Sequence, residues 1–316
     1  MAEELQFYEK ELQEQKKTQV RSFLPSVFVM ASLPLKEVKK NVFIRKYNNV
    51  EMILHSVNNV PYGQYGRLIL SLLTTHAVLN TNDTVELSFK SLNEFTDSLK
   101  LPRPRGKEVL QMLNNFVNTT LQYTEKETKT NVQKSLFPEI YKNNEEGTVT
   151  AYKVNTGNIT FLNNMTTIEL VDENGNQNQK NIAFSIQLNE KFVKLCREHA
   201  VPINYTVYKE ISSPMGKDLY AWLVYRNNFL KDGEPPLFIS KKSLVEQFNP
   251  LSANIKDKRQ GMNVNYSRIK EQVLMIKEKF YPELNVWFEK DGSGMLLTKS
   301  PAVILPEDTR YVLITS

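Results

Sequence analysis

One motif occurs twice in this sequence, as Leu87-Ser-Phe-Lys-Ser-Leu-Asn-Glu-Phe95 and as Ile239-Ser-Lys-Lys-Ser-Leu-Val-Glu-Gln-Phe248. The two copies agree at five of seven consecutive positions, all at one constant offset: Ser88 with Ser240, Lys90 with Lys242, Ser91 with Ser243, Leu92 with Leu244, and Glu94 with Glu246. Each copy has the pattern of a short strand that runs into a helix with a serine at its start. The motif therefore indicates a duplicated structural unit.

The surroundings of the motif are duplicated as well. A helix is predicted before each copy, because leucines recur at helical spacing: Leu68 and Leu72 before the first, Leu219 and Leu223 before the second. A third helix is predicted after each copy, over 107–119 and 266–281, and each leads into β-hairpin patterns. The order helix, strand, helix, turn, helix, hairpin is that of a winged helix. We expect an α+β fold of two tandem winged-helix domains with a short N-terminal helix.

Length and composition agree with two globular domains. The chain has 316 residues, of which 41% are hydrophobic and 24% charged, so each half can bury a core of its own. We expect a polar helix over residues 1–25, a first winged-helix domain over 26–180 and a second over 181–316. The narrow apolar stripe of the polar helix suits docking on its own protein, or on a partner or second copy.

Positive charge is concentrated in two places, although the formal net charge is only +5. Residues 98–107 contain cations and no acid, and residues 254–270 contain cations and a single acid, Asp257. In each copy these cations fall in the turn and at the start of the third helix, where a recognition helix meets phosphates and base edges. Double-stranded DNA is therefore the predicted partner.

The second unit is predicted to carry most of the sequence discrimination. Ile269, Val273, Ile276 and Phe280 form an apolar stripe on its third helix, which leaves the remaining faces free for DNA. The residues predicted to read bases there are Tyr266, Ser267, Arg268 and Lys270, and Asn265 is predicted to contact DNA as well. The residues predicted to hold phosphates are Lys256, Lys258, Arg259, and the wing lysines Lys290 and Lys299. Lys241 and Lys242 are also predicted to contact DNA. In the first unit we expect Arg103, Arg105 and Lys107 to contact the DNA backbone.

Several segments resemble plasmid-encoded RepA-type replication initiators. Tyr65-Gly-Arg-Leu-Ile-Leu-Ser-Leu-Leu-Thr-Thr-His-Ala-Val78 is similar to their N-terminal signature helix, and Ser213-Pro-Met-Gly-Lys-Asp-Leu-Tyr-Ala-Trp-Leu-Val-Tyr-Arg226 to the helix that opens their C-terminal winged helix. Ser91-Leu-Asn-Glu-Phe95 and Phe184-Ser-Ile-Gln-Leu188 extend the resemblance, which covers roughly residues 60–300.

The resemblance implies a theta-type initiator that binds direct repeats, or iterons, at a plasmid origin and helps to melt an adjacent AT-rich region. It also implies host replication proteins as partners (helicase, host initiator and chaperones), and a homodimer in equilibrium with a DNA-binding monomer. In related initiators the N-terminal unit also serves dimerisation, and the dimers repress the initiator's own gene. The stretch after the first motif is less basic here, with only Arg103, Arg105 and Lys107, so we expect that unit to serve dimerisation and backbone contacts.

No enzyme is expected from the sequence. His55, His76 and His199 are dispersed, so they form neither the metal pair of a rolling-circle nuclease nor, with Cys196, a zinc site. The chain has no Gly-rich phosphate-binding loop, and we expect no cofactor. The lone Cys196 lies in an apolar-periodic stretch and is expected to be buried. Because no apolar run approaches a membrane span and no signal peptide is present, a cytoplasmic protein is predicted.

Two other classes of protein remain compatible with these patterns. A transcriptional repressor or phage regulator could use the same tandem units, and it would bind one inverted repeat near its own gene. An assembly factor could use the basic patches against acidic protein surfaces, and it would bind DNA weakly without sequence preference.

Overall fold

The computed structural model describes residues 20–47, 50–130, 150–168, 183–251 and 256–304. Within these residues the protein is α+β, as predicted. Most of the predicted N-terminal helix lies outside the described residues. Its predicted end at residue 25 is wrong, because Arg21–Pro25 form strand β1. Ser22 and Leu24 are buried and alternate with half-buried neighbours, which is the periodicity of a strand.

The first repeated unit has a helix, a strand, two further helices and two further strands. In chain order these are α3 (Gly63–Leu79), β4 (Glu86–Phe89), α4 (Leu92–Ser98), the 3-10 turn η1 (Arg103–Arg105), α5 (Gly106–Val117), β7 (Leu162–Ile168) and β8 (Ala183–Leu188). The strands form an antiparallel sheet in the order β4-β8-β7. The first strand of the unit therefore pairs with the last.

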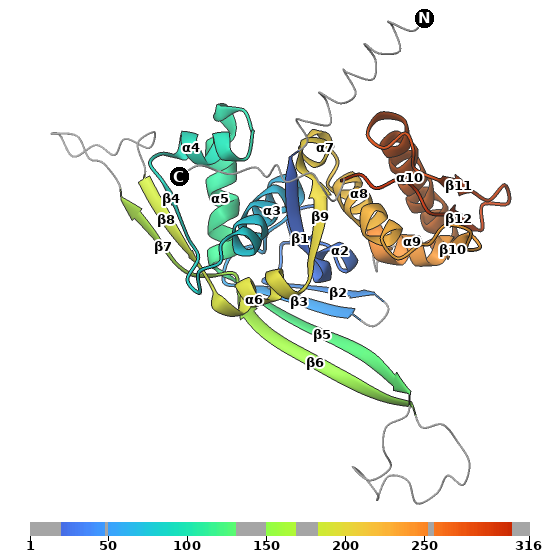
Figure 1. Ribbon diagram of the computed structural model, residues 1–316, viewed down its shortest axis with the longest axis horizontal. Helices are drawn as coiled ribbons and strands as arrows, with labels where there is room; N and C mark the ends of the chain where they lie inside the picture. The colour runs from blue at the N-terminus through green and yellow to red at the C-terminus, as the bar shows by residue number, and fades with distance from the viewer. Residues whose placement is uncertain (1–19, 48–49, 131–149, 169–182, 252–255, 305–316) are drawn as a thin grey trace, which may run out of the picture.

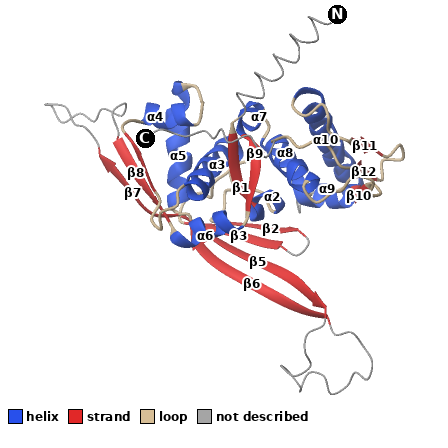
Figure 2. Cartoon of the chain, viewed as in Figure 1, coloured by secondary structure: helices blue, strands red, loops and turns tan. Residues whose placement is uncertain are grey.

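The second repeated unit has the same order of elements. They are α8 (Pro214–Asn227), β10 (Leu237–Ser240), α9 (Lys241–Phe248), α10 (Lys258–Lys279), β11 (Val286–Phe288) and β12 (Gly294–Leu297). The sheet order is β10-β12-β11, so here too the first strand pairs with the last. The two three-stranded sheets lie at opposite ends of the molecule with helices between them (Figure 2).

The β-hairpin pattern that directly follows α5 belongs to a separate sheet. Its four antiparallel strands are β2 (Val42–Tyr47), β3 (Val50–Ser56), β5 (Thr119–Thr130) and β6 (Thr150–Thr160), in the order β2-β3-β5-β6. β3 pairs with β5 only as far as Glu125, so the rest of β5 and β6 projects as a two-stranded ribbon (Figure 1). The ribbon is an insertion between α5 and β7 of the first unit.

Strand pairing crosses the boundary that we predicted at residue 180. β8 follows that boundary in the chain, yet it is the central strand of the first unit's sheet. β1 pairs with β9 (Ala200–Asn204), and the connecting helices α2 (Ser26–Met30), α6 (Glu190–Glu198) and α7 (Tyr205–Glu210) pack around this pair. We had assigned residues 182–188 to the second unit because local patterning does not reveal which distant strand completes a sheet. The boundary between the two units would have to lie after α7.

The duplicated motif has the same role in both units. Leu92 and Leu244 are buried, and so are Phe95 and Phe248. Ser91 caps α4 by accepting a hydrogen bond from the Glu94 amide at 3.1 Å, as predicted. In the second copy the cap is Ser240, which accepts from the Ser243 amide at 3.1 Å, so α9 begins one turn earlier in the motif. Cys196 is buried, as predicted.

Candidate nucleic-acid interface

Helix α10 is the third helix of the second unit and presents one side to solvent. It begins at Lys258, eight residues before the predicted start, where Asp257 accepts a hydrogen bond from the Gln260 amide at 2.9 Å. Its buried side packs on α8 and α9 and consists of Asn265, Tyr266, Ile269, Val273 and Ile276. The middle of the helix, from Asn265 to Ile276, is held against the core, so the positions of the exposed side chains there are set by packing.

The exposed residues at the start of α10 are mostly cationic or polar. The cations are Lys256, Lys258, Arg259, Arg268 and Lys270, and the other exposed residues between 256 and 270 are Asp257, Gln260, Asn263, Val264 and Ser267. Ser267 donates a hydrogen bond to Glu271 at 3.3 Å. The Lys270 ammonium lies 5.4 Å from the centre of the Phe288 ring, on the strand β11 that follows. The structure thus places six of the predicted DNA-binding residues on one exposed segment.

Two residues that we predicted to contact DNA point into the protein instead. The Asn265 side chain donates to the Asn249 carbonyl at 2.7 Å, and the Tyr266 hydroxyl donates to the Gly294 carbonyl at 2.7 Å. Burial also raises the pKa of Tyr266. Tyr266 precedes Ile269 by three residues, so it extends the apolar stripe by one turn. The prediction was wrong because it ended the stripe at Ile269.

The other lysines of the second unit that we predicted to contact DNA differ in whether they already have a partner within the protein. Lys241 donates to Asn263 and lies 5.4 Å from the Tyr266 ring centre, while Lys242 pairs with Glu246 at 3.8 Å. Lys290 is exposed in the turn between β11 and β12.

Lys299 does not belong to the wing. It lies beyond β12 and donates to the Asn227 carbonyl at 2.9 Å. This bond satisfies a backbone oxygen at the C-terminal end of α8, where a cation is favoured. The prediction placed Lys299 in the wing, but the last strand of the hairpin ends at Leu297.

The cations of the first unit are largely paired with acids. Arg103 forms an ion pair with Asp97 at 3.1 Å, and Arg105 forms one with Glu108 at 2.9 Å. Lys107 is exposed in the first turn of α5. The sequence analysis missed these two ion pairs because the acids, Asp97 and Glu108, lie immediately outside the stretch 98–107.

Among the described residues no group of His, Cys, Asp and Glu is arranged to hold a metal ion. None of the described helices has the length and apolar character needed to span a membrane.

A profile of the plasmid-encoded RepA protein family matches residues 60–236, which is more than half of the chain. The chain belongs to the RepA family of plasmid replication initiators. The matched segment of this RepA-family chain contains the whole first unit and the helix α8, and it ends directly before β10. Helix α10 therefore lies outside it.

Two solved structures are also similar to this RepA-family chain. A crystal structure of selenomethionine-labelled domains 2 and 3 of RctB is 12% identical and has a TM-score of 0.45. The similarity covers 87% of this chain and 98% of that one. A second crystal structure of RctB domains 2–3 is 10% identical with a TM-score of 0.43, covering 85% and 94%. No curated protein sequence matches this RepA-family chain.

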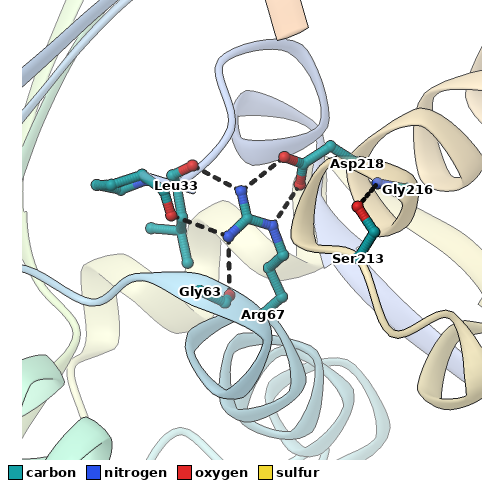
Figure 3. A network of polar contacts seen from close by, with 7 residues as sticks. Leu33, Gly63, Arg67, Ser213, Gly216 and Asp218 are labelled. Atoms are coloured by element: carbon teal, nitrogen blue, oxygen red, sulfur yellow. Dashed lines mark hydrogen bonds and ion pairs between the residues drawn. The ribbon is translucent and has the colours of Figure 1, made fainter. Parts of the chain in front are cut away.

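A buried ionic cluster joins the two units of this RepA-family chain (Figure 3). Arg67 on α3 donates two hydrogen bonds to Asp218 on α8, at 2.7 and 2.6 Å. Its three other N–H groups donate to the carbonyls of Leu33, Pro34 and Gly63. All five guanidinium donors are therefore used. Burial raises the pKa of Asp218, while the charge and hydrogen bonds of Arg67 lower it.

Two further cations lie buried around this ion pair. Lys217 donates to the carbonyls of Tyr208 and Lys209, and burial lowers its pKa to about 7. Burial likewise lowers the pKa of Arg45 on β2, whose charge acts on Asp218. The sequence analysis missed all four residues. For Arg67 and Asp218 the available signal was a charge at the same place in the two aligned helices, directly before Leu68 and directly before Leu219.

Proposed function

We propose that this RepA-family chain initiates plasmid replication by binding direct repeats of double-stranded DNA at an origin. In this proposal the two repeated units are tandem winged helices, and α10 of the second unit is the principal reader. The observation that carries the proposal is the exposed cationic segment at the start of α10, in a unit that combines three helices with a three-stranded sheet.

The sheet order supports the winged-helix assignment. In both units the first strand pairs with the last, and the second strand lies outside it. The last two strands are then antiparallel neighbours, as the two strands of a wing must be. In the second unit they are β11 and β12, with Lys290 in the turn between them. In the first unit they are β7 and β8.

The unequal charge of the two units supports the second as principal reader. Arg103 and Arg105 face Asp97 and Glu108 in the first unit, so releasing them to phosphates would cost two ion pairs. No ion pair within the described residues holds Lys258, Arg259 or Arg268. Cations without acidic partners gain most from phosphate, because counterion release from DNA is then not offset by a broken ion pair.

The remaining parts of the proposal follow from the family. We propose a cytoplasmic protein without a catalytic site, a homodimer in equilibrium with a DNA-binding monomer, repression of its own gene, and contacts with host replication proteins. The presence of several direct repeats of about two helical turns beside an AT-rich stretch near the gene would favour an initiator over a repressor. A single inverted repeat would favour the repressor.

The double variant Lys258→Ala/Arg259→Ala tests the DNA interface. The probe is a duplex carrying the repeats that flank the gene, titrated over a range of salt concentrations. We expect weaker binding to all sequences and a salt dependence whose slope falls by about 0.9 for each lost phosphate contact. The matched control is Lys46→Ala/Lys231→Ala, which removes two exposed lysines that already pair with Glu51 and Glu234. Equal weakening by both variants would show that the interface is wrongly assigned.

A further inference from the structure

Val264 is an apolar side chain on the outward side of the proposed recognition helix. The role inferred for it here rests on the proposed function. Val264 is 43% exposed and is the seventh residue of α10. The same side of the helix contains Gln260, four residues before Val264, and Ser267, three residues after it. It also contains Glu271, four residues after Ser267. Tyr266 and Val273 are on the opposite, buried side. Val264 is therefore central to the exposed face.

The neighbours of Val264 are suited to base edges, but Val264 itself cannot form hydrogen bonds. Gln260 and Arg268, one turn before and one turn after it, are exposed and can pair with adenine and guanine in a major groove. Placing valine among them leaves apolar surface in water, which is unfavourable unless a partner covers it. The nearby cations Lys258, Arg259 and Arg268 favour a polyanion as that partner.

We propose that Val264 reads a thymine by packing against its C5 methyl group. This methyl is the apolar feature that base pairs present in the major groove. The proposal makes Val264 a specificity-determining residue, and it places a thymine next to the bases that Gln260 and Arg268 face. The first unit has no equivalent, because no large apolar residue of α5 is among the exposed ones of the described chain.

Deoxyuridine provides the direct test, because it lacks only the thymine methyl. The full-length protein first selects a duplex from a randomised library, and each thymine of that duplex is then replaced in turn. We expect one or two positions at which the wild type loses about fourfold in affinity, the value of one buried methyl group. At those positions Val264→Ala is expected to bind the thymine and deoxyuridine duplexes equally.

Leu274→Ala is the matched control. Leu274 is 44% exposed on the same helix, but it lies ten residues further along, about 15 Å from Val264 along the axis. This variant is expected to keep the thymine preference, and circular dichroism should show both variants folded.

The outcomes separate the two proposals. If Val264→Ala keeps the thymine preference, or if no thymine of the selected duplex is sensitive, Val264 does not read a methyl although the protein binds DNA. If no sequence is selected and duplex binding lacks salt dependence, the proposed function fails, and the role of Val264 fails with it.

Discussion

Arg67 and Asp218 occupy equivalent positions in the two repeated helices and contact each other. Each directly precedes the first leucine of its helix that aligns in the duplication, Leu68 in α3 and Leu219 in α8. Their side chains are 2% and 6% exposed, and two hydrogen bonds join them. The units thus meet through corresponding residues, as the halves of a symmetric dimer do.

Asp218→Asn should destabilise the protein strongly, because it leaves the Arg67 charge buried without its counterion. We expect the free energy of unfolding in urea to fall by about 3–5 kcal/mol. The control Glu51→Gln breaks an exposed ion pair with Lys46, and its cost should stay below about 1 kcal/mol. The double variant Arg67→Met/Asp218→Leu should recover only part of the loss, because the carbonyls of Leu33, Pro34 and Gly63 then lose their donor. Similar small effects of Asp218→Asn and Glu51→Gln would contradict a structural role for the buried pair.

Gly216→Ala should destabilise the protein because the new methyl group has no space. A Cβ at Gly216 would lie 2.6 Å from Gln272 Oε1 and 2.8 Å from Ile211 Cγ2, and overpacking of this kind costs about 1–3 kcal/mol. Gly66 in α3 is the matched control, since its Cβ would have contacts no closer than 3.5 Å. Gly66→Ala should be neutral or stabilising by up to about 1 kcal/mol in thermal or urea unfolding. Equal effects at the two glycines would be inconsistent with the packing of α10 against the start of α8.

Lys217 should make stability depend on pH. Its pKa in the folded protein is about 7, below its ordinary value of 10.5. Between these values the unfolded chain binds a proton that the folded chain does not, so the free energy of unfolding rises with pH. Lys217→Met removes this contribution, and its stability relative to wild type should decrease as pH rises from 6 to 9. The exposed Lys46→Met serves as the control. A difference between Lys217→Met and wild type that is constant over this range would contradict the prediction.

Tyr266→Phe should change stability and leave base preference intact. The variant loses the hydrogen bond from the Tyr266 hydroxyl to the Gly294 carbonyl, at a cost of about 1 kcal/mol in unfolding free energy. The sequences selected by the variant from a randomised duplex library should match those of the wild type. A changed base preference with unchanged stability would contradict the prediction and indicate that Tyr266 contacts DNA bases.

Asp97→Asn/Glu108→Gln should strengthen DNA binding through the first unit. The two substitutions release Arg103 and Arg105 from their ion pairs. We expect a steeper salt dependence, by up to about 0.9 for each new phosphate contact. Glu51→Gln/Glu234→Gln changes the net charge equally at sites away from α5 and is the control. Equal effects of the two double variants on DNA binding would indicate that net charge acts at long range and that α5 does not contact DNA.

The order of elements could be predicted from the sequence because it depends on neighbours in the chain. The spacing of Leu219 and Leu223 follows the period of one helix, and the Ser91 cap satisfies amides within the same turn. The same local rules placed Ser267, Arg268 and Lys270 on the outside of α10 and Ile269 on the inside.

Pairing between distant segments was decided only by the tertiary structure. β8 completes the sheet of β4 across almost a hundred residues, and β1 pairs with β9 across a longer separation. Nothing local distinguishes such a strand from one that begins a new domain. Arg67 was an isolated charge in an apolar helix until α8 brought Asp218 beside it. The sequence by itself determined which faces are apolar, through helix and strand periods, whereas packing decided which faces and which buried charges meet.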